Sequence, residues 1–365
     1  MRTVPDDTLL DDPRRLAEAD TDGLLRAAAM AGAQVRATVE AAEEAGIDQL
    51  EGTRPRALVL VTRPGAGPMI ADLLQALLTP ACPVPLVVAD AVPSWVGPLD
   101  VVVADTEDPG DTVLAESVGR ATRYGATTVL TAPEEGPVAA AGAGKALLLT
   151  SRVPVPPGFG FPRGMSAALL VMVRLGLLRA DFRTLADELD REAERDHPDQ
   201  ESFVNPAKSL ALRLADRVPL LWGLDPVGAA VAHRAAHVLA EHAGFVTDSA
   251  GYPQALTRLA LYRAAVHTAT GHGLFADPED FTDDPMQRLR VMLLSIRTDE
   301  AAEHARRSVM ATLPDADIMV PAEEVTADEP TLAAVLALRF ELAAFYLGLA
   351  AGTIGGSGRY APANA

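Results

Sequence analysis

A helix face in the second half of the chain carries the residues whose spacing most directly suggests chemistry. His233, His237 and Glu241 recur every fourth residue, so they share one face of the helix expected over 227–242. Side chains at this spacing can present ligands to a metal ion. The ordinary alternative is the polar edge of a packed helix, which the Ala- and Val-rich surroundings favour. We therefore predict no metal site.

Two glycine-containing turns follow expected strands in the first half. Segment 63–68 reads Arg-Pro-Gly-Ala-Gly-Pro, and segment 107–112 reads Glu-Asp-Pro-Gly-Asp-Thr. Such turns, at helix N-termini after buried parallel strands, are where open α/β sheets hold anionic ligands. Gly65 and Gly67 could begin a dinucleotide fingerprint, but its third glycine position is Ile70. No cofactor is therefore expected.

Composition restricts the classes of partner. The 365 residues suit two domains, and the excess of 50 acidic over 31 basic residues gives a net charge of −19. That charge argues against nucleic acid or an anionic membrane as a partner, although a small anionic ligand needs only local donors. With Cys82 as the only cysteine, no intramolecular disulfide can form. We find no signal-peptide pattern and no apolar run of membrane-spanning length, so we expect a cytoplasmic protein.

The elements that must position these residues alternate between strand and helix. Continuous apolar runs predict strands at 56–62, 84–89, 99–104, 126–131 and 145–150, with helices between them. After a Pro- and Gly-rich segment at 153–164 comes an apolar helix at 165–178. The rhythm then restarts, with strands at 217–223, 288–296 and 317–320 and helices at 227–242, 256–269, 299–313 and 331–351. This order predicts an α/β fold of two doubly wound parallel-sheet domains in tandem.

The expected domain organisation has five parts. A helical lead-in at 1–54 packs on the first sheet, and a linker helix at 181–204 joins the two domains. The domains are 55–180 and 205–352, followed by a flexible tail at 353–365. An acidic loop at 277–285 is expected to be solvated.

The order of elements and several motifs resemble the sugar isomerase (SIS) family, in particular bifunctional phosphoglucose/phosphomannose isomerases. The stretches that carry the resemblance are 70–74, 92–98, 110–112, 162–166 (Pro-Arg-Gly-Met-Ser) and 205–211 (Asn-Pro-Ala-Lys-Ser-Leu-Ala). The last three follow one another at the family's spacing. The resemblance implies two SIS-type domains, a sugar-phosphate ligand and a homodimer, with interface or core roles for helices 165–178 and 331–351.

The resemblance also implies a substrate-binding set, which this chain has altered. The family holds the sugar phosphate on two loops close to G-M-G-G-S-G and S-Y-S-G-N-T. Here the matching positions are Gly65 and Gly67 in the first loop and Gly110, Asp111 and Thr112 in the second. The serines of both loops are missing, and the second loop has gained carboxylates that would repel a phosphate.

The catalytic residues implied by the resemblance are only partly retained. Arg163 matches the arginine that stabilises the enediolate, and Glu241 matches the base in the N-E-N-A-K motif. A glutamate near a helix C-terminus is locally unfavourable, which supports a functional role. The family's ring-opening histidine aligns with Thr257, and its C-terminal lysine is absent. His237 and His242 are candidate substitutes for that histidine.

These residues predict a phosphosugar-binding SIS protein that interconverts glucose 6-phosphate or mannose 6-phosphate with fructose 6-phosphate. Glu241 would move the proton between carbons 1 and 2, and Arg163 would stabilise the intermediate. The alternative is a catalytically inactive SIS protein that acts as a sugar-phosphate sensor or a structural partner. A third reading is a substrate that is not phosphorylated, or is cationic, and prefers the acidic loop.

Overall fold

The computed structural model describes residues 7–78, 82–150, 152–271 and 288–355, and the chain forms two compact units. The first unit is Met30–Asp190, and the second joins Met1–Ala29 to Arg191–Ala365. The expected acidic loop at 277–285 and the tail beyond residue 355 lie outside the described residues. Each unit holds one parallel sheet, so the predicted α/β class with two doubly wound sheets is confirmed.

The first unit is built on a five-stranded sheet of order β2-β1-β3-β4-β5, in which every neighbouring pair is parallel. Strands β1, β3 and β4 are almost entirely buried because helices cover both faces. Strand β2 is an edge strand and partly exposed, unlike the buried strand we expected. The strands are β1 (Ala57–Val61), β2 (Leu86–Ala89), β3 (Asp100–Asp105), β4 (Thr127–Thr131) and β5 (Leu147–Leu149).

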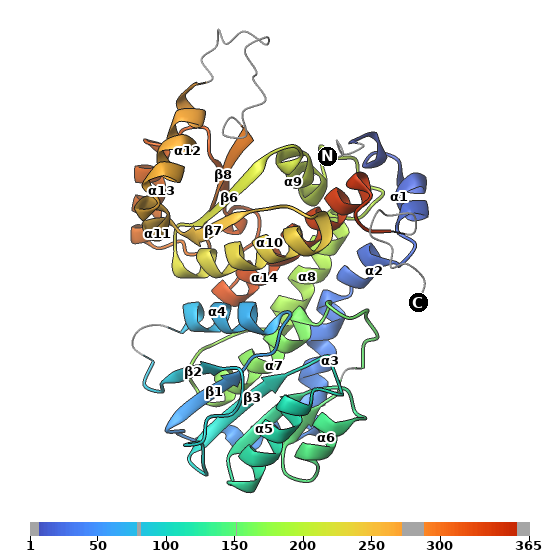
Figure 1. Cartoon of the computed structure of the whole chain (residues 1–365), viewed down its shortest axis with the longest axis vertical. Coiled ribbons are helices and arrows are strands. Elements are labelled where there is room, and N and C mark those ends of the chain that lie inside the picture. Colours follow the sequence, from blue (N-terminus) through green and yellow to red (C-terminus); the bar gives the residue numbers. More distant parts are fainter. Residues whose placement is uncertain (1–6, 79–81, 151, 272–287, 356–365) are drawn as a thin grey trace. The chain divides into compact units, whose positions relative to one another are not determined.

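Helices cover this sheet on both sides (Figure 1). α5 and α6 pack on one face over a core of strand valines, and α3, α4 and α7 pack together on the other. The helices are α3 (Ala31–Glu44), η2 (Ile47–Leu50), α4 (Gly67–Leu77), α5 (Thr112–Arg123), α6 (Pro137–Gly142) and α7 (Phe161–Arg174). α8 (Phe182–Arg195) runs across the boundary between the units in the sequence.

The start of α7 corrects a prediction. The Pro- and Gly-rich segment 153–164 was expected to be irregular to its end, but α7 begins at Phe161, with Pro162 in its first turn. Proline is well tolerated there because the first amides of a helix have no intrahelical acceptor. Arg163 therefore lies inside the helix and is buried, with a side chain only 9% exposed.

The second unit holds a four-stranded parallel sheet of order β7-β6-β8-β9. α10 packs against the sheet and α14, while α12 packs against β8 and shares a core with Trp222. The strands are β6 (Val218–Gly223), β7 (Asp248–Gly251), β8 (Leu289–Leu294) and β9 (Asp317–Met319). The helices are η1 (Asp7–Leu9), α1 (Pro13–Ala19), α2 (Leu24–Ala28), α9 (Pro206–Leu214), α10 (Pro226–Ala243), α11 (Tyr252–Thr257), α12 (Leu259–Gly271), α13 (Glu300–Met310), η5 (Pro321–Glu323) and α14 (Glu329–Ala351).

Four features of this unit differ from expectation. Strand β7 was missed, and the helix expected over 256–269 is two helices, α11 and α12. The helical lead-in is divided, because residues up to Ala29 cluster with the second unit and α3 packs on α7 of the first. α14 is 23 residues long and apolar enough to cross a membrane, contrary to our expectation, but its apolar window is entirely buried within the protein. A core helix of a soluble protein has the same composition.

Candidate functional site

The loops at the carboxyl edge of the first sheet are held by glycines in specific conformations. Gly65 has a φ of +108°, which side-chain-bearing residues rarely adopt, and a Cβ at Gly67 would lie 3.3 Å from Thr62 Cα. These two residues shape the turn from β1 to α4. The glycines of the first loop thus have structural roles whether or not a ligand binds.

Asp111 connects the two loops. It is the N-cap of α5, and its Oδ1 accepts a hydrogen bond from the Leu114 amide at 2.9 Å. Arg63, from the β1–α4 loop, donates from Nε to Asp111 Oδ2 at 2.5 Å and from Nη2 to Oδ1 at 3.3 Å. Burial acts to raise the pKa of Asp111, but the Leu114 amide and the Arg63 guanidinium together lower it. Asp111 is therefore a carboxylate at neutral pH, paired with an arginine.

The other acidic residues of the second loop also bind groups of their own chain. Asp108 Oδ1 accepts from the Gly110 amide at 2.8 Å, and Glu107 Oε2 accepts from the Gly158 amide at 2.6 Å. Thr112, the first residue of α5, is exposed. The amide of Gly110, which would be a phosphate donor in a site of the expected kind, already has an internal acceptor.

Arg163 lies against Asp105, the last residue of β3. Its Nη2 is 3.4 Å from Asp105 Oδ1, and its Nε is buried with no hydrogen-bond partner. A Cβ at Gly160 would collide with Glu107, so the chain passes close over that side chain. Burial raises the pKa of Asp105 to about 6, against the opposing effect of the Arg163 charge, while Glu107 raises it further. The sequence analysis did not single out Asp105 or Arg63. The signal that could have found them is an arginine in the first loop together with carboxylates in the second.

The pH dependence of stability should reveal the buried carboxyl of Asp105. Because its pKa is raised from 3.8, the folded state retains this proton between about pH 4 and pH 6 while the unfolded state has lost it. Stability from this group is therefore complete below pH 4 and is lost as pH rises to 6. We expect urea unfolding to show Asp105→Asn gaining stability relative to the wild-type chain across that window, with a constant difference above it. A constant difference from pH 3 to 8 would contradict the raised pKa.

The predicted residues of the second unit cluster on the last two turns of α10. His237 Nε2 lies 3.3 Å from Glu241 Oε2, and His242 Nε2 lies 3.6 Å from the same oxygen. The side chains of Glu241 and His237 are 38% and 37% exposed, whereas that of His242 is 12% exposed and packs on Phe345. The structure therefore brings the proposed base together with both candidate substitute histidines.

Electrostatics assigns different states to members of this cluster. A hydrogen bond with His237 lowers the pKa of Glu241, with a further contribution from His242. Burial lowers the pKa of His242 to about 4, so this imidazole is neutral at physiological pH. The cluster thus presents an ionised carboxylate beside a neutral imidazole. Among the described residues, no group of three His, Cys, Asp or Glu side chains is arranged to hold a metal ion.

A buried ion pair supports the cluster from behind. Arg234, two turns before Glu241 on α10, donates from Nη2 to Glu341 Oε1 of α14 at 2.9 Å. Both side chains are almost fully buried, at 3% and 6% exposure. The positive charge of Arg234 contributes to the low pKa of Glu241.

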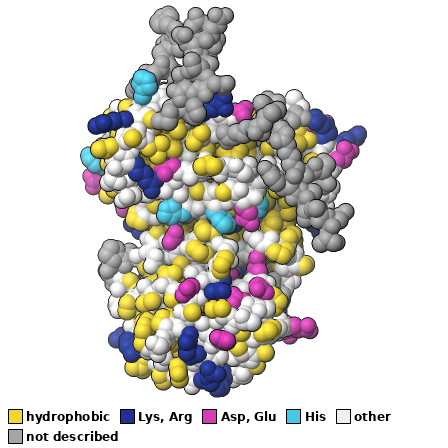
Figure 2. All heavy atoms as spheres, in the orientation of Figure 1, with side chains coloured by type: hydrophobic (Ala, Val, Ile, Leu, Met, Phe, Trp, Pro, Cys, Tyr) yellow, Lys and Arg dark blue, Asp and Glu magenta, His cyan; other side chains and the backbone are white. Residues whose placement is uncertain are grey.

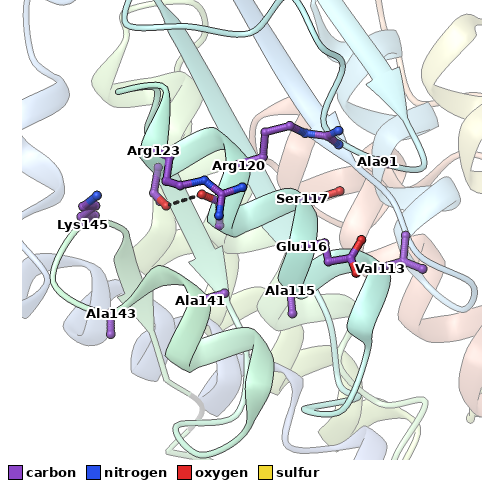
Figure 3. A pocket seen from close by; sticks show the side chains of 12 residues that line it. Ala91, Val113, Ala115, Glu116, Ser117, Arg120, Arg123, Ala141, Ala143 and Lys145 are labelled. Atoms are coloured by element: carbon purple, nitrogen blue, oxygen red, sulfur yellow. Dashed lines mark hydrogen bonds between the residues drawn. The ribbon is translucent and has the colours of Figure 1, made fainter.

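A groove of about 830 Å³ crosses α5 of the first unit but contains none of the predicted site residues (Figure 3). It is lined by small side chains and by Glu116, Arg120, Arg123 and Lys145. Arg120 is engaged, since its Nη2 donates to the Val92 carbonyl at 2.8 Å. On the face drawn in Figure 2, basic side chains gather at the end of the first unit near α5. The groove and the loop site are separate features.

Comparison with known proteins finds one family whose model matches part of the chain. Residues 203–353 match the family model described as the bacterial phospho-glucose isomerase C-terminal SIS domain. Residues 203–353, which form most of the second unit, are thus similar to an SIS domain, and the predicted resemblance to this family is confirmed. A search of curated proteins finds no significant match.

Solved structures extend the similarity in fold over both units. The C-terminal domain of glucosamine-fructose-6-phosphate aminotransferase from Francisella tularensis aligns with a TM-score of 0.62 and 10% identity, covering 92% of this chain and 98% of that one. Tagatose-6-phosphate ketose/aldose isomerase from Escherichia coli gives 0.58 and 13%, covering 90% and 92%. A glucose-6-phosphate isomerase-like protein from Thermus thermophilus gives 0.50 and 19%, covering 93% and 92%. The chain therefore shares its two-sheet fold with these proteins.

Proposed function

We propose that this SIS protein is an aldose–ketose isomerase that interconverts glucose 6-phosphate or mannose 6-phosphate with fructose 6-phosphate. The observation that carries the proposal is the acid–base cluster on α10, in which the Glu241 carboxylate lies within 3.3 Å of His237 and 3.6 Å of His242. Isomerisation needs one base to carry a proton between adjacent carbons, and a partly exposed, ionised carboxylate has the required state.

The proton balance of the reaction fits this cluster. In the aldose-to-ketose direction, Glu241 takes the proton from carbon 2 and the electron pair of that bond forms the enediolate. The hydroxyl proton on the oxygen of carbon 2 passes to the oxygen of carbon 1, and Glu241, now protonated, returns its proton to carbon 1 as the oxygen of carbon 2 becomes the ketose carbonyl. An imidazole of His237 or His242 beside the carboxylate is placed to exchange protons with the sugar hydroxyls during ring opening. For Arg163, which lies in the first unit, the enediolate-stabilising role rests on the family resemblance alone.

Direct measurement of interconversion tests the proposal. The wild-type chain is incubated with fructose 6-phosphate, and glucose 6-phosphate and mannose 6-phosphate are measured separately over time. Formation of either aldose above the protein-free rate, and its reversal from the aldose side, is the expected result. Absence of both products at high protein concentration would reject the isomerase.

The first unit favours a second candidate, a catalytically inactive SIS protein. Its loops have lost the family's serines, and the donors Arg63 and Gly110 are bound to carboxylates of the same chain. A protein with such loops could sense a sugar phosphate or act as a structural partner. Binding without turnover in the same assay mixture would favour the sensor, and absence of binding would favour the structural role.

We also propose that the protein is a cytoplasmic homodimer. Its partner would be a small sugar phosphate rather than nucleic acid or a membrane. The support for this proposal is the acidic composition and the family resemblance. The helices α7 and α14, which we considered for an interface, are almost entirely buried within their own units. The dimer surface must therefore come from other elements.

A further inference from the structure

We propose that Asp111 is an internal ligand that fills an anion site formed by Arg63 and the first turn of α5, and that it determines specificity by excluding phosphate from this site. The inference concerns only the first unit. It bears on the isomerase proposal, because a sugar phosphate turned over by the α10 cluster could not be held through its phosphate at this loop.

The geometry is that of an anion bound by two kinds of hydrogen-bond donor and favoured by a helix dipole. Arg63 contributes Nε and Nη2 in a two-point contact, with its Nη1 fixed by the Asp90 carbonyl at 3.1 Å. The α5 first turn contributes the Leu114 amide, and its macrodipole favours negative charge at this end. The same combination of guanidinium and helix N-terminus binds phosphate groups in many proteins. Here the anion present is the carboxylate of the N-cap residue.

A tethered carboxylate competes strongly with a free anion. Because Asp111 is fixed next to its donors, its effective concentration is on the order of millimolar or higher, which a free ligand must exceed. Asp111 is only 11% exposed and Arg63 22%, so the pair is partly shielded from solvent screening. A phosphate would have to displace the carboxylate and then remain close to it.

The neighbouring acids reinforce the exclusion. Asp108 and Glu107, with their amide donors described above, add negative charge to the same loop. A dianion entering with Asp111 still ionised would meet three carboxylates from this loop. Removal of the Asp111 charge frees Arg63 and lowers this repulsion at one position, so a single substitution should open the site.

The experiment measures binding of inorganic phosphate by isothermal titration calorimetry at constant ionic strength. The test variant is Asp111→Ser, because serine retains an N-cap acceptor while removing the charge. We expect at least a tenfold tighter dissociation constant for phosphate than in the wild-type chain, and loss of that gain in the double variant Asp111→Ser/Arg63→Met. Fructose 6-phosphate is then titrated to determine whether the opened site accepts a phosphorylated sugar.

Two further variants keep the result interpretable. Asp299→Ser changes an N-cap of the same kind on α13, where Asp299 Oδ1 accepts from the Ala302 amide at 2.8 Å, and should leave phosphate affinity unchanged. Asp111→Asn replaces the serine variant if that one does not fold. Equal phosphate affinity in the wild-type and Asp111 variants would overturn the proposal, as would a gain that persists without Arg63. Neither outcome depends on whether the protein turns over a sugar.

Discussion

Glu241→Gln is expected to lower kcat for aldose–ketose interconversion by about 10³-fold, within the range typical of a lost general base. The amide has nearly the same shape but cannot accept the proton from carbon 2. The measurement is the initial rate of each interconversion under saturating substrate, with circular dichroism to show an unchanged fold. Glu300→Gln, at an exposed position on α13, is the matched control and should retain wild-type kcat.

The pH profile separates the proposed base from a merely structural glutamate. His237 is the main cause of the low pKa of Glu241, so His237→Gln should raise that pKa. Activity requires the ionised carboxylate, and the acidic limb of the kcat profile should therefore move to higher pH in this variant. A Glu241→Gln enzyme with kcat within about threefold of wild type would exclude the mechanism.

Arg339→Met is expected to destabilise the second unit by about 3–5 kcal/mol, the usual cost of removing one partner from a buried ion pair. Arg339 of α14 donates from Nε to Glu192 Oε1 at 2.5 Å and from Nη2 to Glu324 Oε2 at 2.5 Å. The side chains of Arg339 and Glu192 are 5% and 0% exposed. The variant leaves Glu192 buried with Arg195 as its remaining arginine partner.

Urea unfolding, followed by a probe in the second unit such as Trp222 fluorescence, measures this effect. Arg306→Met is the control in the same unit, because Arg306 pairs with the more exposed Glu303 and Glu323. Pairs of that kind contribute at most about 1 kcal/mol. Similar midpoints for the two variants would show that the Arg339 network contributes no more than a surface pair.

Apolar patterning was sufficient to predict most of the sheets. β1, β3, β6 and β8 are nearly continuous Val and Leu runs, and burial on both faces is what such runs require. β7 was missed because Asp-Ser-Ala-Gly has no such run. Its place at the sheet edge depends on tertiary contacts, including the hydrogen bond from Trp222 Nε1 to Asp248 Oδ2 at 3.0 Å. A local sequence pattern cannot predict that contact.

The residues of the α10 cluster could be predicted from the sequence more fully than the contacts of the loop site. The grouping of His237 and Glu241 follows from helical periodicity alone, and the structure shows them in contact. The acids of segment 107–112 were visible in the sequence, but their partners were not. Arg63 and Asp111 are 48 residues apart and meet because β1 and β3 are neighbours in the sheet. Strand order, which apolar runs do not specify, decided that contact.

The second unit is discontinuous in the sequence, and this has a consequence for its biosynthesis. α2, near the start of the chain, packs on α14, whose last residue is Ala351. Translation therefore completes the whole first unit before the partner of α2 has left the ribosome. The first unit can fold while the chain is still growing, whereas the N-terminal helices must wait with their apolar residues uncovered. Chaperones that bind nascent chains should thus associate with α1 and α2 until α14 has emerged.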